Sequence, residues 1–86
     1  MSPSTAAARI LLVDDDRLIL STLGGELTAR GFEVATAASG EESVRLAREQ
    51  PFDLVIMDIR MPGLSGIDAA CAIRQSSSVP VLFLTA

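Results

Sequence analysis

Three aspartates stand at the ends of two short apolar runs, and their spacing points to chemistry at a phosphate. Asp14 and Asp15 follow the run Ile10–Val13, and Asp58 follows the run Leu54–Met57. If the two runs are neighbouring strands, three carboxylates share one pocket. Carboxylates that lie so close either take up a proton or hold a hard cation, and an all-oxygen set with few ligands favours Mg²⁺ over zinc. The pattern therefore predicts a magnesium site that receives phosphate.

The elements that must position these side chains are strands and helices in alternation, which predicts an α/β fold. Short, continuously apolar runs are typical of strands that are buried on both faces of a parallel sheet. Strands are expected at 9–13, 32–37, 53–57 and 81–84, and helices at about 17–30, from 40 to about 50, and at 67–74. Ser39 and Glu42 form a capping box for the second helix, and Gly31 is placed to end the first.

Connection rules then give the order of the strands. Short connections and right-handed crossovers predict a parallel sheet in the order 2-1-3-4. That order reverses direction between strands one and three, and ligands of open α/β sheets bind at such a switch point. A second argument thus places Asp14, Asp15 and Asp58 around one cleft.

Length, charge and cysteine content limit the class of protein. The 86 residues allow one small domain, which we expect at 9–86 after a flexible leader at 1–8. No apolar run approaches the roughly 18 residues of a membrane span, and the leader lacks the pattern of a signal peptide, so we expect a cytoplasmic protein without membrane contact. The lone Cys71 agrees with a reducing compartment. Net charge is −4 and the basic residues form no patch, which argues against direct binding of nucleic acid.

Three segments, taken in order, resemble the receiver domain of bacterial two-component response regulators. They are 10–16, 53–63 with Gly66, and 80–86, so the resemblance covers nearly the whole chain from Arg9 onward. It implies a flavodoxin-like (CheY-like), doubly wound parallel sheet. It also implies Mg²⁺-dependent acceptance of a phosphoryl group from a sensor histidine kinase or phosphotransfer protein, which switches an output outside this chain. Such a domain is a phosphoacceptor and not an enzyme.

The resemblance also assigns roles to individual residues. Asp58 would be the phosphoacceptor, Asp15 would bind Mg²⁺ directly, and Asp14 would bind it through water. The backbone carbonyl of Arg60 would complete the protein ligands, and the Thr85 hydroxyl would hydrogen-bond a phosphoryl oxygen and act as a switch. The chemistry is consistent with these roles, because a cation between Asp58 and phosphate offsets the repulsion of a carboxylate nucleophile.

Simpler interpretations exist for several of these residues. Asp14 and Asp15 could merely close a strand, and Asp16 suits a helix N-cap better than a metal site. Thr85 could be an ordinary residue at a strand end. The side chain of Arg60 is expected in solvent, because only its carbonyl is assigned a role.

The sequence departs from the family pattern at one end. Receiver domains continue for a further helix, a fifth strand that carries a lysine, and a final helix, whereas this sequence has no lysine and stops after the fourth strand. We therefore expect a domain that is incomplete at its C-terminal end. An alternative function is a receiver-like interaction module that works without phosphorylation. A phosphatase with an aspartyl nucleophile ranks last, because the second acid that such enzymes need would fall where Arg60 stands.

A missing final helix would leave one face of the sheet bare. We expect that face to include Ile10, Leu12, Val55 and Val81 or their neighbours. An exposed apolar patch beyond a few hundred Å² normally marks an interface. The sequence therefore predicts self-association through the uncovered face.

Overall fold

The computed structural model describes residues 7–84, and these form a four-stranded parallel sheet with three helices. The elements are β1 (Arg9–Val13), α1 (Arg17–Ala29), β2 (Glu33–Ala37), α2 (Gly40–Glu49), β3 (Leu54–Asp58), α3 (Gly66–Arg74) and β4 (Val81–Leu84). The strand order is β2-β1-β3-β4, with every pair parallel. The predicted doubly wound, flavodoxin-like arrangement is confirmed.

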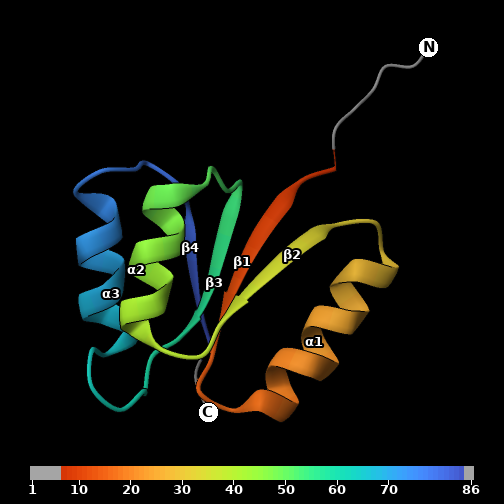
Figure 1. Ribbon diagram of the computed structural model, residues 1–86, viewed down its shortest axis with the longest axis horizontal. Coiled ribbons are helices and arrows are strands. Elements are labelled where there is room, and N and C mark those ends of the chain that lie inside the picture. Colours follow the sequence, from red (N-terminus) through yellow and green to blue (C-terminus); the bar gives the residue numbers. More distant parts are fainter. Residues whose placement is uncertain (1–6, 85–86) are drawn as a thin grey trace.

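The sheet lies between two layers of helices (Figure 1). Helix α1 covers one face, and α2 and α3 lie side by side on the other. The face under α2 and α3 is built from buried Leu11, Val13, Val55 and Met57. The opposite face carries Ile10, Leu12 and Ile56 beneath the leucines of α1 (Leu20, Leu23 and Leu27). Both central strands are apolar on both faces because helices cover both faces.

Local signals fix the ends of the helices. Ser39 Oγ accepts the backbone N–H of Glu42 at 3.1 Å. Glu42 Oε1 accepts the N–H of Ala38 at 2.9 Å, one residue earlier than in an ideal capping box. At the other end of α1, Gly31 has φ +98°, and the chain turns there into β2. These predicted boundaries are confirmed.

Strand β3 begins and ends one residue later than expected. Asp53, which we placed in that strand, lies just before it and ties its start to β1. Its Oδ2 accepts the N–H of Arg9 at 2.7 Å, and its own N–H donates to the Arg9 carbonyl at 2.7 Å. The shift makes Asp58 the last residue of β3.

The expectation of a bare sheet face was wrong for Ile10, Leu12 and Val55, and it was right for Leu82, the neighbour of Val81. Ile10, Leu12 and Val55 are buried, and Val81 is half-buried. The four residues do not even share a face, because Val55 pairs with Leu11 and therefore points to the same side as Leu11. Helix α1 covers Ile10 and Leu12, whereas Val55 packs under α2 and α3.

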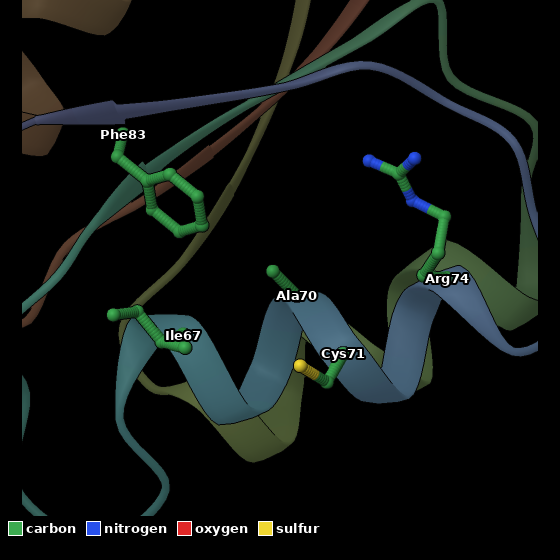
Figure 2. Close-up of a pocket in the computed structure, with 5 residues that line it drawn as sticks. All are labelled: Ile67, Ala70, Cys71, Arg74 and Phe83. Atoms are coloured by element: carbon green, nitrogen blue, oxygen red, sulfur yellow. The ribbon is translucent and has the colours of Figure 1, made fainter.

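The open apolar surface lies on strand β4, next to Val81. Leu82 is 53% exposed and Phe83 is 38% exposed. Phe83 points toward α3 across a hollow of about 280 Å³, which is lined by Ile67, Ala70, Cys71, Arg74 and Phe83 (Figure 2). Among the described residues, β4 pairs only with β3, so its other edge offers free backbone groups.

The absence of a membrane span and the division into leader and domain were also expected from the sequence. Over residues 7–84, no helix combines the length and the apolar character needed to cross a membrane. The division into a leader at 1–8 and a domain at 9–86 stays a prediction, and residues 1–6 lie outside the described part of the chain.

Candidate metal centre

The C-terminal ends of strands β1 and β3 lie next to each other at the same end of the sheet, at the bottom of Figure 1. Val13 at the end of β1 pairs with Met57 of β3, so the residues that follow, Asp14 and Asp58, come out side by side. Asp15 follows directly. One carboxylate oxygen from each of the three aspartates lies within 4.8 Å of the others. The structure thus brings together the three acids that the sequence singled out.

Asp14 is the buried member of this acidic cluster. It is 3% exposed, and its N–H donates to the Ala37 carbonyl at 3.1 Å, which anchors it to the end of β2. Burial raises the pKa of Asp14 above its ordinary value, and the charges of Asp58, Asp15 and Asp16 raise it further. A hydrogen bond from the N–H of Asp16 to Asp14 Oδ1, at 2.9 Å, opposes this rise.

The other two acids open toward solvent. Asp15 is exposed and Asp58 is half-buried, so the cluster runs from a buried carboxylate to accessible ones. A divalent cation would offset the repulsion among the carboxylates, which adds to the effect of burial on the pKa of Asp14. Carboxylate oxygens at this spacing are hard ligands, which fit Mg²⁺ and do not fit the nitrogen and sulfur preference of zinc. The residues present therefore fit a magnesium ion.

The loop between β3 and α3 (residues 59–65) is tied closely to Asp58. The N–H of Arg60 donates to Asp58 Oδ1 at 3.3 Å. The N–H of Gly66 donates to the Ile59 carbonyl at 2.9 Å, which closes the base of the loop. Met61 is buried in the core, whereas Arg60 is exposed, as expected for its side chain. The assignment of the Arg60 carbonyl as a metal ligand stays a prediction.

Of Asp16 and Thr85, which the sequence analysis also discussed, the structure describes Asp16. Asp16 is the N-cap of α1, where its Oδ1 accepts the N–H of Leu18 at 2.9 Å. This confirms the capping interpretation, and the carboxylate of Asp16 is not one of the three that form the acidic cluster. Thr85 lies outside the described residues, so its role as a phosphoryl contact and switch stays a prediction.

One residue near the site was missed by the sequence analysis. Glu41, in the first turn of α2, hydrogen-bonds the backbone N–H of Leu64 in the β3–α3 loop. No local pattern signals this contact, because an acid in the first turn of a helix is common for reasons of the helix dipole alone.

Comparison with known proteins identifies the family. A family model for the response regulator receiver domain matches residues 10–86. The chain belongs to this receiver domain family. Receiver domains are the phosphoacceptor modules of two-component signalling, and the acidic cluster of this receiver domain stands where a switch-point site is expected in the fold.

Relatives and solved structures support the assignment. The chain is 43% identical over 77 residues to the transcriptional regulatory protein AfsQ1 of Streptomyces coelicolor, covering 90% of this receiver domain and 34% of AfsQ1. It is 50% identical over 80 residues to YrkP, an uncharacterised transcriptional regulatory protein of Bacillus subtilis, covering 93% of this chain and 34% of YrkP. This receiver domain thus spans about a third of the length of these relatives.

A solved structure bears on the metal. The receiver domain of the sensor histidine kinase PA1611 from Pseudomonas aeruginosa superposes with a TM-score of 0.88 at 36% identity, over 94% of this chain and 69% of that chain. That structure has a magnesium ion coordinated in its active-site cleft. A magnesium-binding receiver domain with this fold therefore exists among the relatives.

Proposed function

We propose that this receiver domain accepts a phosphoryl group on Asp58 in a Mg²⁺-dependent reaction. The donor would be a phosphohistidine of a sensor histidine kinase or of a phosphotransfer protein. The observation that carries the proposal is the grouping of Asp58 with Asp14 and Asp15 within 4.8 Å, at the open end of β3. A half-buried carboxylate at that position is accessible to an incoming phosphoryl group.

The residues of the site would have separate roles in phosphoryl transfer. A carboxylate oxygen of Asp58 forms the new bond to phosphorus while the bond from phosphorus to the donor nitrogen breaks, and the released imidazole takes up a proton. Asp14 and Asp15, with the carbonyl of Arg60, would hold the metal. Mg²⁺, when bound, would offset the charge that builds up between Asp58 and the phosphoryl oxygens. The domain itself receives the phosphoryl group, and it is not an enzyme that converts a separate substrate.

The signal would pass to an output outside this chain. The matched relatives are named as transcriptional regulators and are about three times as long, which supports an output segment beyond the residues described. This segment has a net charge of −4 and no basic patch, so we propose that it does not itself bind nucleic acid. The site of action would be the cytoplasm, where sensor kinases present their phosphohistidines.

Labelling with acetyl phosphate tests the proposal. We expect label on the wild-type chain in the presence of Mg²⁺, no label without Mg²⁺, and no label on Asp58→Asn. Asp16→Asn is the matched control, because Asp16 caps α1 outside the cluster, and it should keep most of the label. Label that persists on Asp58→Asn would move the acceptor elsewhere. A folded chain that binds a sensor kinase and takes no label would favour the alternative, a phosphorylation-independent interaction module.

We infer in addition that the 86-residue polypeptide self-associates through β4. The support is the pair of exposed apolar residues Leu82 and Phe83 on an edge strand, beside an apolar hollow. An exposed, apolar edge strand is a template for pairing with another chain. Glu33 and Thr36 make the opposite edge, β2, more polar, so β4 is the stronger candidate.

A further inference from the structure

The first turn of α2 contacts the β3–α3 loop through Glu41. Glu41 Oε2 accepts a hydrogen bond from the backbone N–H of Leu64 at 3.3 Å. The two residues are 23 positions apart in the sequence, so the bond joins separate elements. Leu64 belongs to the same loop as Arg60, whose N–H contacts the Asp58 carboxylate.

Two glycines allow the helix and the loop to come this close. Gly63 has φ +75°, and a Cβ built there would lie 3.1 Å from Glu41 Oε2. A Cβ built on Gly40 would lie 2.5 Å from the Leu64 carbonyl oxygen. A side chain at position 40 would push the loop backbone away from the first turn of α2, whereas one at position 63 would be strained by the positive φ and would displace the Glu41 carboxylate slightly. The glycines therefore allow the Glu41 carboxylate to approach the loop backbone closely.

The neighbouring acid, Glu42, makes different contacts. Glu42 caps its own helix, since its Oε1 accepts the N–H of Ala38 and its N–H donates to Ser39 Oγ. The first turn of α2 thus carries two acids with separate partners. Glu42 serves the stability of α2, whereas Glu41 reaches a loop that begins at the metal centre.

We propose that Glu41 is a positioning residue for the metal centre. The bond from Gly66 to Ile59 joins the two ends of the loop, and the bond from Leu64 to Glu41 fixes the loop to the first turn of α2. Loss of the bond to Glu41 lets the exposed part of the loop near Leu64 sample more conformations. A smaller fraction of molecules then presents the arrangement that binds metal, and the apparent affinity falls by that fraction. The inference rests on the proposed function, because it concerns affinity for Mg²⁺ at the acidic cluster.

The test compares three variants of the whole chain, with Mg²⁺ alone as the probe. Titration followed by NMR at the amides of Asp58 and Gly66 gives the Kd, solvent exchange of the Leu64 amide reports the loop, and thermal unfolding reports stability. Glu41→Ala should weaken Mg²⁺ binding about threefold and speed exchange at Leu64. Glu41→Gln keeps an acceptor oxygen in the same place and should bind Mg²⁺ nearly as wild type does.

Glu42→Ala is the matched control for charge and for helix stability. It removes one negative charge from the same turn and breaks the cap, so it should lower the Tm and leave the Kd for Mg²⁺ unchanged. Equal weakening by Glu41→Gln and Glu41→Ala, or by Glu42→Ala and Glu41→Ala, would mean that general charge sets the affinity, and the inference would be wrong. An unchanged Kd in Glu41→Ala would refute the inference and leave the proposed function intact. Absence of Mg²⁺ binding in the folded wild type would refute both.

Discussion

Gly66 lies directly against the backbone carbonyl of Asp58. A Cβ built on Gly66 would overlap the Asp58 carbonyl oxygen and would lie 2.9 Å from the Cα of Ile59. At the same place the N–H of Gly66 donates to the Ile59 carbonyl at 2.9 Å. The first residue of α3 is thus packed onto the residue proposed to accept phosphate, and only glycine fits there without a shift of backbone.

Replacement of Gly66 should therefore disturb both stability and the site. We expect Gly66→Ala to lower the free energy of unfolding by about 1–3 kcal/mol, because backbone atoms must move to admit the methyl group. Gly25→Ala is the control, since Gly25 lies in α1 with nothing within 4 Å of the new Cβ, and it should raise stability by about 0.5–1 kcal/mol. Urea denaturation of both variants checks the pair. Equal effects of the two substitutions would contradict the packing argument.

Asp14→Asn should make the metal-free protein more stable at neutral pH. Burial raises the pKa of Asp14 in the folded state above 3.8, so the folded state favours the protonated carboxyl. The wild type consequently loses stability as pH rises from about 3.8 through the folded-state pKa, and the loss is complete above it. Asn has no charge to bury, so its burial does not reduce stability as pH rises, and its side-chain oxygen can still accept the N–H of Asp16.

The measurement is denaturation of wild type and Asp14→Asn with a chelator at several pH values. The stability difference should grow through that window and then level off. With Mg²⁺ at 100 times its Kd, the wild type alone should gain about 2.7 kcal/mol by linkage. Parallel stability curves across the whole pH range would show that Asp14 carries no penalty.

Asp16→Ala should weaken α1 and spare the site. Loss of the N-cap leaves the N–H of Leu18 without its partner and should cost about 1 kcal/mol in the free energy of unfolding. Asp16→Asn retains a good N-cap and should cost less. Urea denaturation gives the stability, and acetyl phosphate labelling in Mg²⁺ gives the function. Loss of label in the still folded Asp16→Asn protein would place Asp16 in the site after all.

Leu82→Glu should reduce self-association of the polypeptide. Leu82 is 53% exposed on the edge strand, so a charge there is tolerated by the fold and opposes pairing of two apolar edges. Leu18→Glu is the control, because Leu18 is 74% exposed on helix α1 and not on the edge strand, and it should leave the association state unchanged. Sedimentation velocity separates the outcomes. A wild-type chain that stays monomeric, with strand amides well protected from exchange, would refute self-association.

Much of this molecule was set by local sequence. Buried strands that end in carboxylate, joined by short right-handed connections, were enough to predict the strand order and the meeting of Asp14, Asp15 and Asp58. The caps at Asp16 and Ser39 were predictable because a cap involves residues only two or three positions apart.

Contacts between distant segments were decided only by the tertiary structure. The bond from Leu64 to Glu41 and the packing of Gly66 on Asp58 join separate elements, and no periodicity or local motif encodes them. The error over Val55 has the same origin, because the side to which Val55 points depends on its pairing with Leu11 and on which helix lies above. Apolar runs specify that a strand is buried. Strand register and helix placement determine which residues each strand packs against, and register and placement are properties of the assembled sheet.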